Sequence, residues 1–514
     1  MLKKSVTYLF CVILTAFLLS TFVGAEEAVF SDAQYDVKGF DEPSAISDGN
    51  TQTTFATGTH GTPRVTVSRE GNIGGVYVIF DKASTAWTLS DKDETVSVQC
   101  GANGFLHEYV NVSEHFTEGV TELVLTFPIG TAISEIYVFS EGEIPDWVQL
   151  WQPPHEKADL LLIAAHGGDE HIFFAGVIPY YAIERQMNVQ VAYLTGNSDS
   201  HERPHEILSG LWKAGIRNYP VFSDIPEVTA TAGDRTDAKN IALDAYTKAG
   251  YSFDSFVEYI TECIRRFKPI VIVSHDSDGE NGNGTHVICA DAIAESLNCS
   301  LNDGKYLDSV ENYGTWMPEK VYLHLYSENK ITIDIDKQYE SLGGKSPFEV
   351  SREAFECHKT QLWTWYDWMF GSTSSPINKA SEIEKHSPCK YGLFHTTVGN
   401  DKAGSDFFQN TKSHADKDHD LETQTIGTIA PVETLPSELT APVVDTEVDT
   451  EDETSDDKDS VKTPFKVDRE FVIIAIVLVA VGICIAVIIF TVASSKTSVR
   501  SRRRKRAERR DRNK

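Results

Sequence analysis

The chain has 514 residues and a formal net charge of -30. Residues 494–514 carry eleven Lys or Arg and only two acidic residues, so the rest of the chain has a net charge near -39. A surface of that charge repels a phosphate backbone, which excludes nucleic acid as an expected partner.

The N-terminal residues have the pattern of a secretory signal peptide. Lys3 and Lys4 precede an apolar run at 8–23, and the run ends in the small residues Gly24 and Ala25. Such a segment directs export and is then removed. We therefore predict a signal peptide at residues 1–25.

Residues 30–145 contain short β-branched and aromatic runs, among them 75–80 and 122–127. Turn clusters such as 47–50 and 71–74 separate the runs at short intervals. This alternation of short strands and turns predicts an antiparallel β-sandwich. No catalytic cluster is visible in this part of the sequence.

Residues 155–410 have a different sequence pattern, in which apolar strands alternate with helical stretches. The expected strands lie at 159–165, 189–195, 270–274 and 320–326, and the expected helices at 173–185, 204–214, 256–267 and 287–297. Alternation of this kind predicts an α/β domain with a Rossmann-like, mostly parallel sheet and helices on both faces.

The remaining residues predict a stalk, a membrane span and a tail. Residues 412–468 are acidic, rich in Thr and Pro and almost without aromatics, which predicts a disordered stalk. Residues 471–493 carry no charge and are long enough to cross a bilayer. The acidic residues before this span and the basic tail at 494–514 place the C-terminus in the cytoplasm. We expect a single-pass type I protein of the cell membrane with an extracytoplasmic ectodomain.

Six of the eight cysteines lie in the predicted ectodomain, and they contain no CxxC pair. So few cysteines in so long a segment do not make a disulfide scaffold, although export permits one or two bridges.

Two polar loops follow strands of the predicted parallel sheet. The first contains His166 and Asp169, and the second is a Gly-rich loop at 275–286 in which His286 opens the next helix. Because the carboxyl ends of parallel strands meet at one edge of a sheet, these side chains can converge. Two His and one Asp leave a fourth position open for water, as in catalytic zinc sites.

On spacing alone, other interpretations of these loops remain open. A hydrogen-bonded polar turn in which His166 caps local backbone fits the same residues. The alternation of Asp276, Asp278 and Glu280 is compatible with a calcium loop, although no closing Glu of an EF-hand follows it. Neither loop contains GxGxxG, which disfavours a dinucleotide site.

Several segments of residues 155–410 are similar to one family when they are taken together. They are the loop Ala-His-Gly-Gly-Asp-Glu at 165–170 and the segments at 203–206, 275–276, 396–400 and 406–408. They resemble the PIG-L or LmbE-like zinc-dependent N-deacetylases, which have Ala-His-Pro-Asp-Asp-Glu after the first strand and Gly-His-x-x-His before a later helix. Residues 30–145 more loosely resemble a discoidin-like, galactose-binding sandwich.

The resemblance implies hydrolysis of an acetamide on an amino sugar or glycan. It implies Zn2+ held by His166, Asp169 and His286, where the ion would lower the pKa of a bound water toward about 7 and polarise the substrate carbonyl. It also implies substrate contacts from Arg203 and His205.

Two positions depart from the pattern of the family. Gly168 stands at the position of the general-base Asp, and loss of a general base typically costs about 10²–10⁴-fold in rate. Asn283 stands at the position of the His thought to stabilise the oxyanion, and an amide can still donate there. Glu170 and Asp276 are our first candidates for a substitute base, and His171 and Glu280 are further candidates. Each of the four is also explained as a cap, a support for a ligand or a solvated charge.

Aromatic residues gather on a predicted helix, at Trp363, Trp365, Tyr366 and Trp368. Such a cluster can stack on a sugar ring, but it is more often part of a core.

The sequence therefore predicts a membrane-anchored, extracytoplasmic, metal-dependent N-deacetylase-like hydrolase for N-acetylated amino sugars or glycans. One alternative is a catalytically impaired glycan-binding surface protein that retains the three metal ligands. Another is a structural adhesin in which the triad is coincidental.

Overall fold

The computed structural model describes residues 28–427 apart from positions 31, 42, 58–60, 84–85, 197–199, 403 and 405. The predicted signal peptide, membrane span and basic tail, and most of the predicted stalk, lie outside these residues. Within the described ranges, no helix has both the length and the apolar character needed to cross a bilayer.

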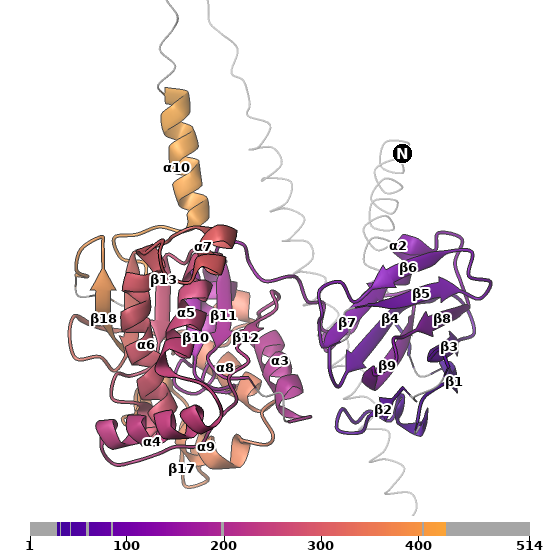
Figure 1. The fold of residues 1–514 in the computed structure, drawn as a ribbon, viewed down its shortest axis with the longest axis horizontal. Helices are drawn as coiled ribbons and strands as arrows, with labels where there is room; N and C mark the ends of the chain where they lie inside the picture. Colours follow the sequence, from indigo (N-terminus) through magenta and orange to yellow (C-terminus); the bar gives the residue numbers. More distant parts are fainter. Residues whose placement is uncertain are drawn as a thin grey trace, which may run out of the picture. The chain divides into compact units, whose positions relative to one another are not determined.

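The N-terminal part is a β-sandwich of two antiparallel sheets (Figure 1). One sheet has the order β1 (Gln34–Lys38), β3 (Arg64–Ser68), β8 (Glu122–Thr126), β5 (Trp87–Asp91) and β6 (Ser97–Cys100). The other has the order β2 (Phe55–Ala56), β9 (Ala132–Ser140), β4 (Ile73–Phe80) and β7 (His107–Asn111). Two short elements, η1 (Pro43–Ala45) and α2 (Val112–His115), complete it. The predicted antiparallel sandwich is confirmed.

The alternation of apolar side chains explains why these strands pair into two layers. Val65 and Val67 of β3 and Leu123 and Leu125 of β8 are fully buried and belong to the same core cluster as Val76 of β4. Inward-facing residues recur every second position along each strand, as one face of a pleated sheet requires. The sandwich core therefore lies between the two sheets.

The second part is built on a seven-stranded sheet. Its order is β12 (Val221–Phe222), β11 (Val189–Tyr193), β10 (Leu160–Ala164), β13 (Val271–Ser274), β14 (Lys320–His324), β18 (Lys390–Thr396) and β15 (Lys330–Thr332). The first five strands run parallel, and β18 pairs antiparallel with both β14 and β15. The prediction of a mostly parallel sheet is confirmed.

Helices cover both faces of this sheet. Leu161 and Ile163 of β10 pack in one core cluster with α4 (Arg235–Lys248), α5 (Phe253–Phe267) and α6 (Gly284–Leu301). Leu160 and Leu162 pack in the other core cluster with α3 (Arg203–Ala214) and α8 (Pro347–Phe355). Successive residues of a strand point to opposite faces, so β10 needs both layers.

Shorter elements complete this part of the chain. They are η2 (Pro179–Glu184), η3 (Glu280–Gly282), α7 (Leu307–Tyr313), η4 (Glu340–Leu342), α9 (Leu362–Phe370), β16 (Gly371–Ser372), β17 (Ser375–Pro376) and η5 (Ala380–Glu382). Local signals fix several ends: Ser346 and Glu349 form a reciprocal capping box at the start of α8, and Asp234 caps α4.

The strand order places a candidate site. From β10 the chain moves outward through β11 and β12, and then returns to the other side of β10 with β13 and β14. The order therefore reverses between β10 and β13, which are hydrogen-bonded neighbours. Ligands of open α/β sheets bind beyond the carboxyl ends of the strands at such a reversal.

The helix predicted at 173–185 is wrong in its first half. The chain follows turns through Gly176 and then forms η2, which is a π-helix that starts at Pro179. Gly176 has φ +81 and its N–H donates to Ser351 Oγ at 2.7 Å, so a regular helix cannot pass through it.

The disorder predicted for 412–468 is wrong at its beginning, because His414–Gly427 form helix α10. The first turn is anchored on the α/β domain. The His414 N–H donates to Asp159 Oδ1 at 2.6 Å, its Nε2 lies 2.9 Å from the Lys268 carbonyl oxygen, and Lys417 pairs with Glu319. Composition predicted disorder here because it does not register these tertiary contacts.

The six described cysteines, Cys100, Cys263, Cys289, Cys299, Cys357 and Cys389, form no disulfide with one another.

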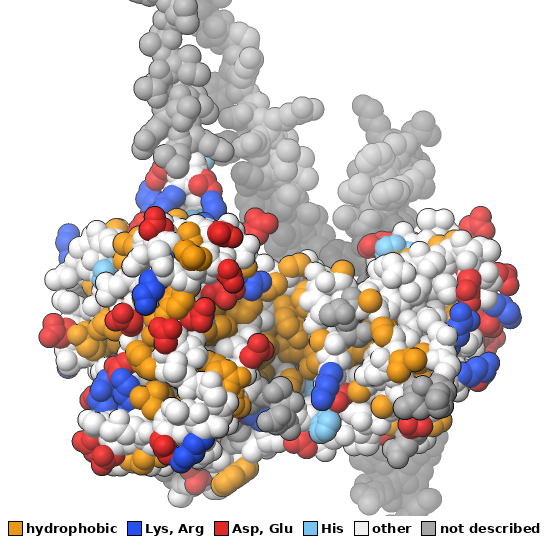
Figure 2. Space-filling view, viewed as in Figure 1, with side chains coloured by type: hydrophobic (Ala, Val, Ile, Leu, Met, Phe, Trp, Pro, Cys, Tyr) orange, Lys and Arg blue, Asp and Glu red, His pale blue; other side chains and the backbone are white. Residues whose placement is uncertain are grey.

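Charged side chains of both signs are interspersed with apolar ones on the face that Figure 2 shows.

Candidate metal centre

The first polar loop begins where β10 ends at Ala164. The His166 N–H donates to Asp169 Oδ2 at 2.8 Å, which closes a tight turn and fixes the carboxylate. The Ala165 N–H donates to His275 Nε2 at 2.8 Å, so the first loop is tied directly to the loop that follows β13.

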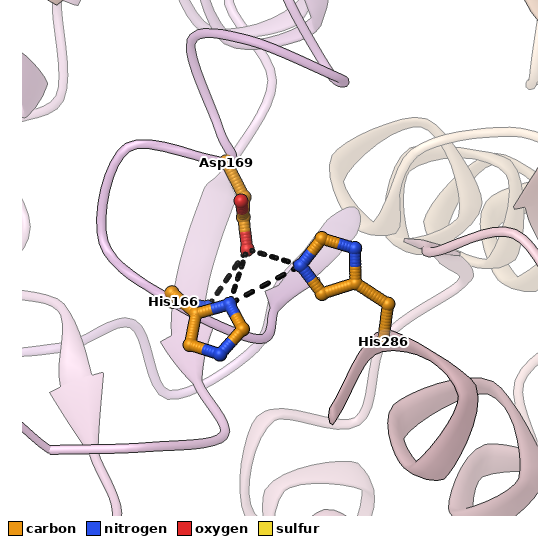
Figure 3. A group of neighbouring side chains, drawn as sticks. All are labelled: His166, Asp169 and His286. Atoms are coloured by element: carbon orange, nitrogen blue, oxygen red, sulfur yellow. Dashed lines mark hydrogen bonds and ion pairs between the residues drawn. The ribbon is translucent and has the colours of Figure 1, made fainter. Parts of the chain in front are cut away.

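The two loops bring His166, Asp169 and His286 together (Figure 3). His166 Nδ1 lies 3.3 Å from Asp169 Oδ2 and 3.2 Å from His286 Nε2, and the remaining pair of atoms is 3.4 Å apart. Two ligands of a tetrahedral zinc with bonds of about 2.0–2.1 Å are about 3.3–3.4 Å apart. The three predicted ligands therefore present their donor atoms at the spacing that one such ion requires.

Glu280 lies behind this group and organises three imidazoles. Its Oε2 accepts from His286 Nδ1 at 2.9 Å and from His275 Nδ1 at 3.0 Å, and its Oε1 accepts from His324 Nδ1 at 2.7 Å. A proton on Nδ1 of His286 leaves Nε2 free to bind a metal, so Glu280 sets the tautomer of a candidate ligand. Glu280 is fully buried, which contradicts its interpretation as a solvated charge or as an accessible base.

The calcium-loop interpretation is also contradicted at Glu280. This side chain turns inward toward the imidazoles, whereas the side chain of Asp278 is 81% exposed. The alternating acids of the second loop therefore do not converge on a common point.

The electrostatics of the triad follow from these contacts. Burial favours the neutral form of Asp169, but the neighbouring imidazoles of His286, His166 and His275 hold its pKa well below the usual value. Burial acts in the same direction on Glu280, and the imidazole of His275, with those of His286 and His324, holds its pKa low as well. Both carboxyl groups are therefore ionised, as ligation and support of a cation require.

Glu170 faces away from the triad. Its Oε2 accepts from the Gly168 N–H at 2.7 Å, and its Oε1 faces the Nε2 atoms of His171 and His358. Burial raises the pKa of Glu170 to about 8 and lowers the pKa of His171 to about 3. The candidate base Glu170 thus belongs to a separate cluster, and His171 belongs to it too.

The other two candidate catalytic residues hold local backbone. Asn283 is the N-cap of α6, where its Oδ1 accepts from the Thr285 N–H at 2.8 Å. Asp276 accepts from the Asp278 N–H at 3.2 Å within its own turn. Their catalytic roles stay predictions, and the structure gives each side chain a structural contact in addition.

The two residues predicted to bind substrate are both buried on α3. Arg203 donates to the Gly167 carbonyl oxygen at 2.6 Å and so supports the first loop beside the triad. His205 faces the sandwich instead, where its Nδ1 lies 2.8 Å from His107 Nε2. The structure brings Arg203 to the candidate site and gives His205 a different partner.

Gly168 has a conformation that explains the absence of an acid there. Its φ is +104, in the region that favours glycine. A Cβ at this position would lie 2.6 Å from Gln361 Oε1. A side chain at 168 would therefore meet both backbone strain and a close contact.

Four residues near the centre were not identified as site residues from the sequence. His324 bonds to Glu280 behind the triad, and His358 belongs to the cluster of Glu170. Gln361 lies where a side chain at position 168 would extend, and His386 Nε2 accepts from the Asn281 N–H at 3.2 Å. His324 ends strand β14, so the strand-end rule that identified His166 applies to it as well. The other three lie in connections without a motif.

The aromatic cluster divides between the core and the surface. The ring of Phe173 packs edge-on against His286 with centroids 5.4 Å apart, and against Trp365 at 5.2 Å. Trp365 and Trp368 pack on the core, as we favoured, whereas Trp363 is 79% exposed and Tyr366 is 46% exposed. Helix α9 therefore lies beside the triad and presents aromatic surface to solvent.

The chain matches no protein-family model and no curated protein. Among solved structures it is similar to the N,N'-diacetylchitobiose deacetylase from Pyrococcus horikoshii, with 13% identity over 47% of this chain and 85% of that one and a TM-score of 0.31. It is similar to the conserved protein TT1542 from Thermus thermophilus, with 10% identity over 47% and 97% and a TM-score of 0.28. A third similarity is to CpGH89CBM32-6 from Clostridium perfringens, with 16% identity over 21% and 93% and a TM-score of 0.17. Likenesses of this size carry no argument about activity, which has to rest on the side chains.

Proposed function

We propose that this chain is a metal-dependent, N-deacetylase-like hydrolase that acts on N-acetylated amino sugars or glycans. The observation that carries the proposal is the convergence of His166 Nδ1, Asp169 Oδ2 and His286 Nε2 at mutual distances of 3.2–3.4 Å. The resemblance of the two loops to zinc-dependent N-deacetylases supplies the reaction type.

The donor set fits zinc. Two imidazole nitrogens and one carboxylate oxygen are ligands that zinc accepts, and three protein ligands leave one position open. Glu280 behind His286 provides the carboxylate–histidine support that is common at such sites. A zinc ion bound there supplies a water of lowered pKa and polarises a substrate carbonyl.

The chain itself contributes positioning. The Asp169 carboxylate is fixed by the His166 N–H, and His286 is fixed by Glu280, so two of the three ligands have a set orientation before any ion binds. The ligands His166 and Asp169 are each 6% exposed and His286 is 3% exposed, so solvent reaches the group only narrowly. Such enclosure strengthens electrostatic interactions with a bound substrate.

Proton transfer is the weak step in this mechanism. Gly168 cannot accept a proton, Glu170 faces the other cluster, and Asp276 accepts a backbone hydrogen bond within its turn. Loss of general-base assistance typically lowers the rate by about 10²–10⁴-fold. We therefore infer slow turnover.

A second candidate function is a catalytically impaired glycan-binding protein that keeps the metal. The left-handed conformation of Gly168 favours it, since the loop is built without an acid. A cavity of about 520 Å³ that is lined by the sandwich and by residues 150–152 also favours it, because its walls include polar and aromatic side chains such as Gln99, Glu108, Tyr109 and Trp151. Sugar rings bind to surfaces of this mixed kind.

The location of the protein is proposed from the sequence alone. The charge pattern around residues 471–493 and the apolar run near the N-terminus support a type I membrane protein with the site outside the cytoplasm. A glycan of the cell surface or its surroundings is then the expected substrate.

The test combines metal content with product release. The purified full-length protein, loaded with Zn2+ and freed of excess, is compared with His166→Ala and with His115→Ala, which removes an exposed histidine of α2 as a matched control. We expect His166→Ala to lose one zinc per chain, and His115→Ala to lose none.

Acetate release from oligosaccharides of N-acetylglucosamine then separates the two functions. Slow release that disappears in His166→Ala supports the hydrolase. Zinc at the triad with glycan binding but no acetate supports the binding protein. Equal zinc content in His166→Ala and the unchanged protein would contradict both functions.

A further inference from the structure

A second group of donor atoms lies on the other side of the first loop. Glu170 Oε1 is 3.5 Å from His171 Nε2 and 3.6 Å from His358 Nε2, and one donor atom of each residue lies within 4.8 Å of the other two. Glu170 and His171 directly follow the ligand Asp169 in the sequence, whereas His358 comes from the turn after α8. All three side chains are fully buried.

Most polar atoms of this cluster lack hydrogen-bond partners. Both ring nitrogens of His171, both ring nitrogens of His358 and Oε1 of Glu170 make no hydrogen bond. Buried polar groups in folded proteins almost always have a partner, so five orphaned atoms in one place require an explanation.

We propose that Glu170, His171 and His358 form a second metal site, which takes a divalent transition ion of the zinc class. One carboxylate oxygen and two imidazole nitrogens are the donor types of the first triad, and the distances of 3.5 and 3.6 Å from Glu170 Oε1 to the two nitrogens are close to the roughly 3.3–3.4 Å that a tetrahedral zinc requires. An ion at their centre would give Glu170 Oε1 and one nitrogen of each imidazole the partner that each lacks.

A glycine keeps this space open. A Cβ on Gly210, within helix α3, would lie 2.7 Å from His358 Nε2 and 2.8 Å from His171 Nε2. Glycine inside a helix is unfavourable and therefore has a packing or functional reason. Here that reason is room beside the two nitrogens that face the carboxylate.

An ion in this position would connect separate segments. It would link the loop after β10 to the turn after α8, beside α3, and it would hold the carboxylate whose Oε2 accepts from the Gly168 N–H. Because Glu170 and Asp169 are adjacent, the second ion would stabilise the loop that positions two ligands of the first. The enclosed position of all three ligands indicates a structural ion that does not contact substrate.

The test is the metal stoichiometry of the full-length protein. The protein is stripped with a chelator, reloaded with Zn2+, freed of excess by gel filtration and analysed for zinc per chain by mass spectrometry. We expect two ions per chain, one after His358→Ala, one after His286→Ala, and none in the double variant. The exposed-histidine variant His115→Ala should keep two.

Gly210→Ala tests the same site with every ligand intact. The added methyl group occupies the space beside the two imidazoles, and alanine favours the helix, so we expect one zinc per chain in a folded protein. Circular dichroism and gel filtration identify folded variants. If His358→Ala does not fold, the stoichiometry of the unchanged protein and of Gly210→Ala still decides the question.

A Co2+-loaded His286→Ala protein gives a readout that does not depend on activity. Its visible d–d bands would report the second site alone, and they should disappear when His358→Ala is added. One zinc per chain that is lost in His286→Ala and retained in both His358→Ala and Gly210→Ala would overturn the proposal. One zinc that is lost in His358→Ala and retained in His286→Ala would support this site and contradict the proposed function.

Discussion

The loop that follows β10 has two sides, and each side carries a buried cluster of histidine and carboxylate. His166 and Asp169 point to one side, where Glu280 and the His166 N–H give the ligands hydrogen-bonded support. Glu170 and His171 point to the other side, where their facing atoms have no hydrogen-bond partner. The first cluster is slightly exposed and the second is completely enclosed.

The comparison shows that residue type and burial alone do not determine what a polar cluster does. The ionised carboxyl of Glu280 is stabilised by three imidazoles, whereas burial raises the pKa of the Glu170 carboxyl to about 8. A supported and reachable cluster suits chemistry on a substrate. An unsupported and enclosed cluster suits an ion that holds the fold.

Replacing the two buried carboxylates provides the largest expected contrast. In the metal-free full-length protein, Glu280→Gln removes the charge that three imidazoles face, and loss of one partner from a buried pair costs about 3–5 kcal/mol. Glu170→Gln keeps an oxygen for the Gly168 N–H, so we expect a cost below about 1 kcal/mol. Urea unfolding measures both values. Equal costs would show that the two clusters do not differ in this way.

His107 and His205 form a third buried histidine cluster, apart from the two clusters of the loop after β10. His107 Nδ1 bonds to the Tyr77 hydroxyl and its Nε2 faces His205, and burial lowers the pKa of His205 to about 4. The unfolded chain takes up this proton near pH 6.5 but the folded chain does not, so stability is present above pH 6.5 and is lost as the pH falls through about 4. At about 1.4 kcal/mol for each pKa unit, His205 accounts for up to about 3 kcal/mol.

Unfolding experiments between pH 7 and pH 4 measure this effect. Asp81 and His201 also act on His205, in opposite directions, so the shape of the curve includes both. His205→Asn should flatten the pH dependence by the share that His205 contributes. An unchanged curve would assign the acid sensitivity to the other buried histidines.

Introducing an acid at position 168 tests why the triad of His166, Asp169 and His286 has no general base beside it. We expect Gly168→Asp to cost about 1–3 kcal/mol, because a non-glycine residue at φ +104 is strained. We expect no gain in acetate release, since the new side chain also meets Gln361. The double variant Gly168→Asp with Gln361→Ala removes the contact and keeps the strain. Faster acetate release by Gly168→Asp would show that the loop accommodates the acid.

Trp363→Ala has the smallest expected effect on stability. The side chain is 79% exposed, so the free energy of unfolding should change by less than about 0.5 kcal/mol. If α9 contributes to glycan binding beside the triad, calorimetry should show weaker binding of N-acetylglucosamine oligosaccharides. Trp365→Ala, which removes a ring packed on Phe173, is the matched variant and should lower stability more. Unchanged binding in Trp363→Ala would remove this tryptophan from the substrate surface.

The site residues that could be predicted from the sequence are those that follow a strand of the parallel sheet. His166 and Asp169 follow β10, and His286 comes after the strand that pairs with it, so topology alone brings the two loops to one edge. The strands themselves were placed within two residues of their ends in the structure, because fully buried parallel strands are continuous apolar runs.

The parts that it missed depend on contacts between distant residues. Glu280 was interpreted as a solvated charge because it stands in a Gly-rich loop with alternating acids. The turn at η3, with Asn281 at φ +55, directs it inward instead. His358 lies 187 positions after its neighbour His171 and belongs to no motif, so no local pattern connects them.

The attachment of α10 has a consequence for how the reaction centre meets its surroundings. His414 bonds to Asp159, which precedes the amino end of β10, while His166 follows the carboxyl end of the same strand. Five strand residues span about 17 Å, so the polypeptide leaves the folded domain at the edge opposite the metal ligands. The anchored first turn of α10 therefore leaves the carboxyl ends of the strands, where the metal ligands lie, uncovered.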